Sequence, residues 1–173
     1  MISDPAGKTA VITGAASGIG FALAQRCVAK GMRVALADIE EVALEDAAAK
    51  LREDGGEVLP VVTDVSQPEY VEGLAHRVAQ EFGPVHLLCN NAGVGSGGLI
   101  VDLRLQDWEW VLGVNMWGVI HGLHAFLPGM LDHGEEGHIV NTASLAGHVS
   151  APFMGPYGAS KFAVVALSES LFH

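Results

Sequence analysis

The C-terminal part of the sequence contains a tyrosine and a lysine whose spacing suits proton transfer. Tyr157 and Lys161 are four residues apart, so on a helix their side chains share one face. A free tyrosine, with a pKa of about 10, is a poor base at neutral pH, but a neighbouring ammonium group stabilises the phenolate. The Ser144 hydroxyl would hydrogen-bond a substrate oxygen, and Lys161 could also hold a nucleotide ribose. Such a pair also arises by chance, so its position in the fold matters.

The N-terminal part contains a glycine-rich segment of the kind that binds a diphosphate. Residues 13–20 read Thr-Gly-Ala-Ala-Ser-Gly-Ile-Gly. The first glycine permits a tight turn, the second lets a diphosphate approach the backbone, and the third lets a following helix pack closely on a strand. The helix N-terminus offers free N–H groups to the diphosphate. A plain tight turn is the alternative. The candidate cofactor-binding residues here are Gly14, Ser17, Gly18, Ile19 and Gly20.

An acidic residue follows at the distance expected for a ribose contact. Asp38 lies 18 residues beyond Gly20, and its carboxylate would accept both ribose hydroxyl groups of NAD. No arginine or lysine follows at residues 39–41, and Ala16 in the glycine-rich segment is not basic either. A 2′-phosphate would therefore meet a carboxylate and no cation, which favours NAD over NADP. A strand-end turn is the alternative role of Asp38.

Two further segments fit a nucleotide site. Asp64 would hydrogen-bond the adenine amino group while Val65 packs on the ring, although Asp before Ser also suits the entry of a helix. Asn91, Ala92 and Gly93 follow an apolar run, where an amide holds a neighbouring strand and a glycine leaves room for a ribose. On composition alone, this second segment is an ordinary turn.

Polar residues elsewhere have weaker functional interpretations. Asn115 lies in an apolar helical segment, where it either holds a water connecting Lys161 to solvent or serves helix packing. His148 either lines the same cleft or is a loop residue. A metal hydrolase is disfavoured, because His121 and His124 have no third ligand at a suitable spacing. No metal site is therefore expected.

The elements that position these residues alternate between strands and helices. Five runs are apolar at successive positions: Thr9–Thr13, Arg33–Asp38, Glu57–Asp64, Val85–Asn90 and His138–Ala143. Such runs are typical of parallel strands that are buried on both faces. Helical spacing follows in Gly18–Lys30, Val42–Glu53, Glu69–Phe82, Asp107–Leu131 and from near Tyr157 to the end. The alternation predicts a doubly wound α/β fold of the Rossmann type, whose ligands bind beyond the carboxyl ends of the strands.

Composition and charge exclude several classes of protein. The chain has 173 residues, a length typical of one domain, and a formal net charge of −11 with no basic patch, which argues against a nucleic-acid partner. The N-terminus resembles no signal peptide. Glycines, histidines and Pro128 interrupt the most apolar stretch, Val111–Met130, so no membrane span is expected. Cys27 and Cys89 are expected to be buried free thiols, which fits the cytoplasm.

Together these residues resemble the short-chain dehydrogenase/reductase family. The matches, in family order and spacing, are Thr13, Gly14, Gly18, Ile19, Gly20, Asp64, Asn90, Asn91, Ala92, Gly93, Asn115, Ser144, Tyr157 and Lys161. The resemblance implies strand order 3-2-1-4-5 and reversible hydride transfer between NAD(P) and a small-molecule alcohol or carbonyl. It implies a catalytic tetrad of Asn115, Ser144, Tyr157 and Lys161, with Tyr157 as general acid/base and Tyr157 and Lys161 also contacting the cofactor. It further implies a homodimer or homotetramer packed through the helices that carry Asn115 and Tyr157.

The length departs from the family pattern. Family members continue past the Tyr–Lys helix into two more strands, whereas this sequence stops at Leu171-Phe172-His173. We therefore expect residues 1–173 to be one NAD(P)-binding Rossmann domain without the final strands of the family. Three explanations are open: a truncated chain or fragment, a naturally short member, or a dimer that replaces the missing layer. An NAD-binding module without turnover, or a structural subunit, is the alternative function.

The substrate would meet two loops, Val94–Asp102 and His148–Pro156. Four of their side chains suggest an apolar pocket: Leu99, Ile100, Phe153 and Met154. The identity of the substrate does not follow from these residues.

Overall fold

The fold is built on one parallel sheet, described in a computed structural model that covers residues 2–172. The strands are β1 (Thr9–Thr13), β2 (Arg33–Asp38), β3 (Val58–Val62), β4 (Leu87–Asn90) and β5 (His138–Asn141). They lie in the order β3-β2-β1-β4-β5, and every neighbouring pair is parallel. This confirms the predicted doubly wound Rossmann fold and its strand order.

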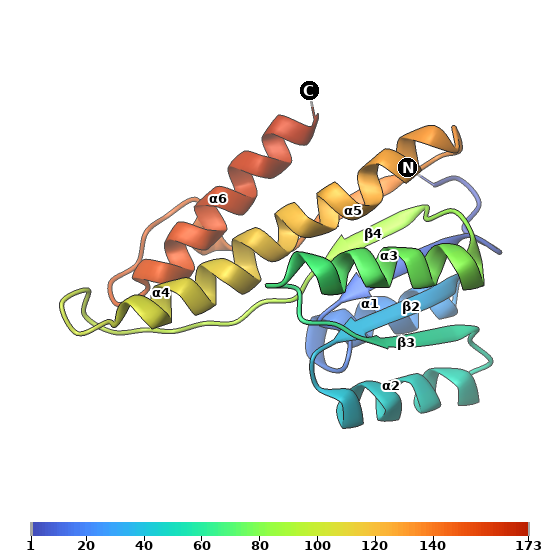
Figure 1. Cartoon of the computed structure of the whole chain (residues 1–173), viewed down its shortest axis with the longest axis horizontal. Coiled ribbons are helices and arrows are strands. Elements are labelled where there is room, and N and C mark those ends of the chain that lie inside the picture. The colour runs from blue at the N-terminus through green and yellow to red at the C-terminus, as the bar shows by residue number, and fades with distance from the viewer. Residues whose placement is uncertain (1, 173) are drawn as a thin grey trace.

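Helices cover both faces of the sheet (Figure 1). Their bounds are α1 Gly18–Val28, α2 Glu41–Glu53, α3 Pro68–Phe82, α4 Leu105–Leu112, α5 Gly118–Asp132 and α6 Gly155–Phe172. One apolar cluster joins α1 and α2 to side chains such as Ile12, and a second joins α3 and α5 to side chains such as Val11. Alternate residues of β1 enter opposite clusters, so the strand is buried throughout and its three central residues are all apolar, as in strands covered on both faces.

The strands begin and end close to the predicted positions, with shorter ends at the loops. The predicted run Glu57–Asp64 becomes β3 over five residues, because Thr63 and Asp64 already belong to the loop at the sheet edge. Pro60 lies within β3, which is an edge strand, where a residue without an N–H group is tolerated. Gly31, Gly55 and Gly83 follow helices with positive φ, as their positions predict.

The predicted helix Asp107–Leu131 is interrupted by a π-helical turn. This turn spans Gly113–Trp117 and separates α4 from α5. A π turn inserts one extra residue, and such turns are frequent at functional sites. Gly118, just after the turn, packs against Val65, where a Cβ atom would lie 2.9 Å from Val65 Cγ2. The turn directs the buried Asn115 side chain away from solvent, toward neighbouring segments described below.

The helical segment Leu105–Asp132 is long and apolar enough, by length and mean hydropathy, to cross a membrane. A core helix of a folded domain meets the same criterion, so the prediction that this stretch does not span a membrane is not contradicted and stays a prediction. Within the fold, however, its α5 part packs on α3 and β4, and its α4 part packs on α6. A third of its most apolar window is buried, as in a helix that covers one face of a sheet.

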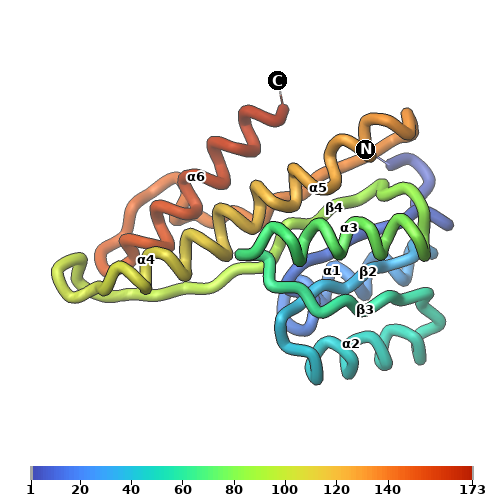
Figure 2. The backbone as a smooth tube through the Cα atoms, viewed as in Figure 1, coloured from blue at the N-terminus to red at the C-terminus, as the bar shows by residue number. Residues whose placement is uncertain are grey.

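The loop after β4 and the loop before α6 extend beyond the sheet. Residues 91–104 run from β4 to the far end of the molecule, where α6 begins (Figure 2). There the Gly98 N–H donates to the Phe153 carbonyl over 2.9 Å. The loops predicted to meet the substrate are therefore joined to each other by the backbone.

Candidate functional site

The glycine-rich loop after β1 has the backbone geometry that its sequence predicts. Gly14 and Gly18 have φ values of 64° and 54°, in the left-handed region that favours glycine. A Cβ atom on Gly14 would lie 2.8 Å from Ala92 Cα, and one on Gly20 would lie 2.7 Å from Asn91 Nδ2. A Cβ atom on Gly18 would meet no described atom within 4 Å, so this face of the loop is open.

The first turn of α1 has unused hydrogen-bonding groups. Ser17 is the N-cap residue, is exposed, and its side chain makes no capping hydrogen bond. The N-terminus of α1 carries no acidic side chain in its first turn. Free backbone N–H groups and the positive end of the helix dipole form a site for an anionic group. The Ser17 hydroxyl and the open face of Gly18 adjoin this site, which fits a diphosphate.

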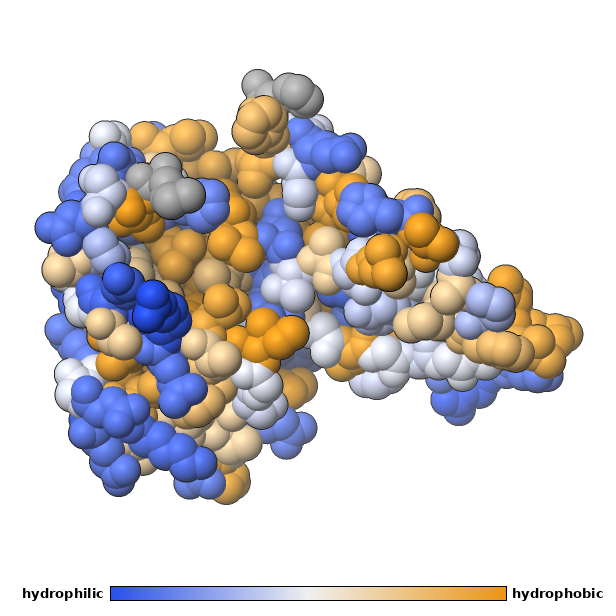
Figure 3. All heavy atoms as spheres, turned by 180° about the vertical axis from the view of Figure 1, so that it is seen from behind, coloured by the Kyte–Doolittle hydropathy of each residue, from blue (hydrophilic) through white to orange (hydrophobic). Residues whose placement is uncertain are grey.

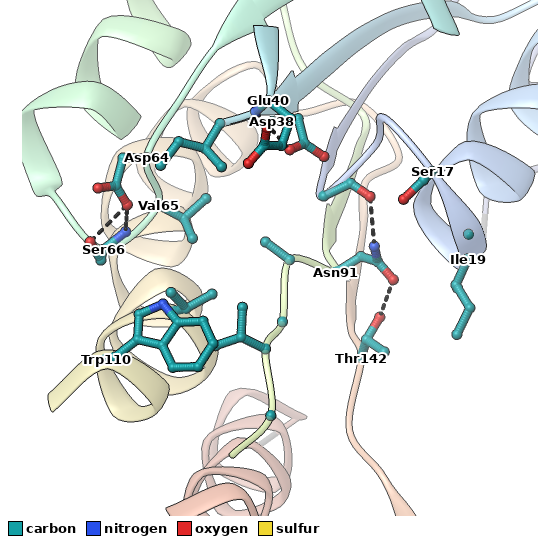
Figure 4. A pocket seen from close by; sticks show the side chains of 18 of the residues that line it. Ser17, Ile19, Asp38, Glu40, Asp64, Val65, Ser66, Asn91, Trp110 and Thr142 are labelled. Carbon is teal, nitrogen blue, oxygen red and sulfur yellow. Dashed lines mark hydrogen bonds between the residues drawn. The ribbon is translucent and has the colours of Figure 1, made fainter. Parts of the chain in front are cut away.

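Asp38 is held in place at the end of β2. Its Oδ2 accepts the Ala16 N–H over 3.0 Å, and its Oδ1 accepts the Glu40 N–H over 3.2 Å. Figure 4 shows Asp38 and Glu40 together on one side of the pocket. The backbone donors thus hold a negative charge at the position predicted to bind the ribose.

Asp64 adopts the helix-entry conformation that was the alternative to adenine binding. Its Oδ1 accepts both the Ser66 N–H (2.9 Å) and the Ser66 hydroxyl (2.7 Å), just before α3. The residue still lines the pocket, and within residues 2–172 no hydrogen bond to its Oδ2 occurs. The two interpretations are compatible, because each would use a different carboxylate oxygen.

Asn91 ties the ends of three strands together. Its Nδ2 donates to the Thr13 carbonyl (3.0 Å) and the Gly14 carbonyl (3.3 Å), and its Oδ1 accepts the Thr142 hydroxyl (3.1 Å). The Thr13 hydroxyl in turn accepts the backbone N–H groups of Asn91 and Ala92. Asn91 therefore holds its neighbouring strands, as its residue type suggests, and fixes the glycine-rich loop against β4.

The lysine predicted to assist proton transfer is buried. Lys161 is 4% exposed, and its Nζ donates to the Thr142 carbonyl over 2.7 Å. The same Nζ lies 5.7 Å from the centroid of the Tyr157 ring. Burial lowers the pKa of Lys161, because it penalises the charged form. A buried ammonium without a carboxylate partner is costly, and such groups are typical of functional sites.

The Ser144 hydroxyl is oriented by its own loop. Ser144 caps a short 3-10 turn, Leu145–Gly147, and its Oγ accepts the Ala146 N–H over 3.1 Å. Because the oxygen is an acceptor in this contact, the hydroxyl hydrogen remains available for a donor role. Ser144, Tyr157 and Lys161 all line the same cavity.

Asn115 is anchored by segments far away in the sequence. Its Oδ1 accepts the Val94 N–H (2.8 Å), while its Nδ2 donates to the Val94 carbonyl (2.9 Å) and to Ser160 Oγ (3.0 Å). A Cβ atom on Gly93 would lie 3.5 Å from Asn115 Oδ1 and 3.7 Å from Lys161 Nζ. Both polar groups therefore face the same small space above Gly93.

One cavity of about 1090 Å³ connects most of these residues (Figure 4). Every predicted cofactor or catalytic residue lines it except Gly20 and Asn115, which lie behind its wall. The sequence interpretation missed several lining residues, among them Ile39, Trp110, Val114 and Thr142, whereas Val94 belongs to a loop predicted to meet the substrate. Trp110 and Val114 are four residues apart on a helix, so this spacing was the available signal.

The substrate loops expose apolar side chains at the projecting end of the molecule (Figure 3). The exposed residues here include Leu99, Ile100, Val101, Phe153 and Met154. Phe153 is the one non-glycine residue with positive φ (66°) in the described chain. His148 is exposed and does not line the cavity, so the structure places it on the loop surface.

A second polar cluster lies at the opposite edge of the sheet, where β1 and β4 begin. The side chains of His86, His133 and Glu135 bring ligand atoms within 4.8 Å of one another. His86 accepts the Thr9 N–H and contacts Glu135, while His133 contacts the Val85 carbonyl and accepts the Glu135 N–H. Glu135 also pairs with Lys8. These contacts form a hydrogen-bond network that closes the amino-terminal edge of the sheet.

Comparison with known proteins agrees with the fold and identifies the family. The family model described as short chain dehydrogenase matches residues 8–173. A crystal structure of a short chain dehydrogenase/reductase from Burkholderia phymatum in complex with NAD is 51% identical. It superposes with a TM-score of 0.98 over 99% of this chain and 61% of that chain. This chain therefore belongs to the short chain dehydrogenase family.

Curated relatives are longer than this chain. A 1-deoxy-11-beta-hydroxypentalenate dehydrogenase from Streptomyces avermitilis is 41% identical over 95% of this chain and 62% of its own length. A CLA biosynthesis dehydrogenase/reductase from Lactiplantibacillus plantarum is 36% identical over 94% of this chain and 57% of its own length. The chain thus spans about three fifths of these relatives.

Proposed function

We propose that this chain binds NAD and that its residues transfer protons while a hydride passes between the cofactor and an alcohol or carbonyl substrate. The supporting observation is that one cavity joins an open diphosphate-type loop to Ser144, Tyr157 and the buried Lys161. Bound NAD would supply or accept the hydride. The remaining chemistry is a proton transfer, and these three side chains are suited to it.

The hydrogen bonds of Ser144 and Lys161 support the proposed proton-transfer roles. In alcohol oxidation, the Tyr157 oxygen removes the hydroxyl proton, while the free hydrogen of Ser144 holds the substrate oxygen. The Lys161 ammonium, 5.7 Å from the centroid of the Tyr157 ring, favours the negatively charged phenolate. A water above Gly93 would contact both Asn115 Oδ1 and Lys161 Nζ and so connect the lysine to solvent. Carbonyl reduction uses the same groups in reverse.

The cofactor preference follows from charge at the adenosine end. Asp38, Glu40 and Asp64 line this part of the cavity, and Lys161 is the one lysine or arginine among the described lining residues. A 2′-phosphate would therefore face carboxylates without a cation. We propose NAD as the cofactor, with Asp38 accepting hydrogen bonds from the ribose hydroxyl groups.

The substrate is proposed to be uncharged and apolar near its reacting carbon. The loops at the substrate end expose Leu99, Ile100, Phe153 and Met154. Arg104, the arginine closest to them in sequence, is already paired with Asp107 over 2.9 Å. Apolar side chains around a few polar groups are typical of small-molecule sites.

Association of identical copies is proposed through the helices that carry the site. The segment α4–α5 and helix α6 pack on each other at one side of the sheet and expose apolar side chains such as Phe162 and Leu131. Such surfaces are typical of interfaces between copies.

Both cysteines are buried free thiols, which fits a cytoplasmic location.

The test is a turnover assay on this chain. Secondary alcohols of increasing apolar size are incubated with NAD, and NADH is followed by its absorbance. We expect turnover with apolar alcohols, loss of turnover in Tyr157→Phe, and a smaller loss in Ser144→Ala. Binding of NAD without turnover of any alcohol or ketone would indicate a binding module, and undiminished turnover in Tyr157→Phe would refute the proposed role.

A further inference from the structure

The chain has three tryptophans within one short helical region, and only one of them faces the cofactor cavity. Trp108 packs against Gly155, where a Cβ atom would lie 3.3 Å from its ring. Trp117 stacks obliquely on His121, with ring centroids 5.8 Å apart. Trp110 instead lines the cavity while 51% of its surface is exposed. Half of the Trp110 surface is therefore accessible at the cavity.

The place of Trp110 in the cavity is the adenosine end. Figure 4 shows its indole across an open space from Asp38 and Glu40, with Val65 between them along the wall. Val114, one helical turn after Trp110, lines the cavity too. Val65 is held from behind, because His121 Nδ1 contacts its carbonyl over 2.9 Å and Gly118 packs on its side chain. The Val65 side of the space is therefore held in place.

The chemistry of these walls points to a flat, weakly polar ring. Ile39, 58% exposed, lines the same cavity from the end of β2. The space thus has two large apolar surfaces, Ile39 and Trp110, beside carboxylates that accept hydrogen bonds. The face of a purine fits the apolar surfaces, and its amino group can donate a hydrogen bond to a carboxylate. Indole rings also stack on nucleobases.

We propose that Trp110 is a wall of the adenine subsite and contacts the face or edge of the adenine ring of the cofactor. This inference rests on the proposed cofactor binding and adds a specific binding residue to it. Stacking on an aromatic side chain contributes enough to change affinity by about tenfold when the ring is removed. The contribution belongs to the adenine half of the cofactor and leaves the hydride chemistry untouched.

Binding measurements with ADP-ribose test the proposal, because this probe contains the adenine, both phosphates and no nicotinamide. Calorimetry compares the wild-type chain with Trp110→Ala, Trp110→Phe and the control Tyr70→Ala. We expect about tenfold weaker ADP-ribose binding for Trp110→Ala, near-wild-type binding for Trp110→Phe, and no change for Tyr70→Ala, because Tyr70 is as exposed as Trp110 but lies outside the cavity. Thermal unfolding verifies that each variant is folded.

Fluorescence gives an independent readout. Adenine stacked on an indole quenches its emission, so ADP-ribose should quench the wild type and Trp117→Phe but lose most of its effect in Trp110→Phe. Wild-type affinity in a folded Trp110→Ala would overturn the proposal, and a change in oligomeric state alone would assign Trp110 to a contact between copies. If the wild type binds neither ADP-ribose nor NAD, the proposed function itself fails, and this inference fails with it.

Discussion

Replacing two glycines of the loop after β1 by alanine should separate stability from cofactor binding. Gly18 has a φ of 54°, and a Cβ atom there would meet no described atom within 4 Å. Gly20 has ordinary helical backbone, but a Cβ atom there would lie 2.7 Å from Asn91 Nδ2 and would also overlap the Gly14 carbonyl. The two substitutions add the same methyl group in opposite surroundings.

The expected magnitudes differ accordingly. Gly18→Ala costs about 1 kcal/mol of folding free energy, the strain of a left-handed alanine. Gly20→Ala costs about 2–3 kcal/mol, because the methyl group meets backbone that cannot move without opening the loop. For a chain of this length, 1 kcal/mol lowers the melting temperature by roughly 2–4 °C. Gly18→Ala should therefore lower it by a few degrees, and Gly20→Ala by roughly twice that amount or more.

The effect on NAD affinity should be large in Gly18→Ala, although that variant loses less stability than Gly20→Ala. In Gly18→Ala, the new methyl group projects from the open face that the diphosphate would approach, so NAD binding should weaken at least tenfold in a nearly stable protein. Circular dichroism melts and NAD calorimetry on both variants supply the data. The reasoning is refuted if Gly20→Ala is as stable as the wild type, or if Gly18→Ala binds NAD with wild-type affinity.

Three further predictions concern charge, acid and the proton path. Asp38→Asn keeps the acceptor for the Ala16 N–H but removes the negative charge, so the ratio of NADP to NAD affinity, measured by titration, should rise about tenfold; an unchanged ratio would contradict the role of the charge. Burial lowers the pKa of His86, and hydrogen bonds from Lys8 and His86 lower the pKa of Glu135. At each group, the unfolded chain therefore binds a proton more readily than the folded chain does. The stability from His86 is present above about pH 6.5 and that from Glu135 above about pH 4.5, and each is lost as the pH falls below that value. Urea midpoints that stay constant from pH 7.5 to 4 would contradict this. Asn115→Ala removes the hydrogen bonds to Val94 and should lower kcat at least tenfold while leaving ADP-ribose affinity within about twofold; equal losses in both would indicate a purely structural role.

The sheet could be predicted because its strands are covered on both faces. Short continuous apolar runs such as Arg33–Asp38, rich in Val and Leu, are typical of strands buried on both faces, and the glycines that follow helices mark the helix ends. The residues directly after each strand then had to meet at one edge, which brought Asp38, Asn91 and Ser144 to one cavity. The parallel topology alone is sufficient for that result.

Other features depend on contacts that a local pattern does not contain. The π turn at Gly113–Trp117 is associated with hydrogen bonds that Asn115 donates to the Val94 carbonyl and to Ser160 Oγ, both distant in the sequence. The His86–Glu135 network joins the starts of two strands to the end of a helix, and neither residue type nor spacing indicated it. Trp110 looked like one member of an apolar helix, because only the fold distinguishes the cavity side from the packed side.

The central claim is that Tyr157 transfers the proton in a cavity that binds NAD independently of that tyrosine hydroxyl. The most direct measurement is a paired one on the full 173-residue chain, in which NAD affinity by calorimetry and turnover of an apolar secondary alcohol are determined for the wild type and for Tyr157→Phe. We expect turnover in the wild type and its loss by at least a thousandfold in Tyr157→Phe. We expect the NAD affinities of the two proteins to agree within about threefold. Retained turnover in Tyr157→Phe would contradict the claim.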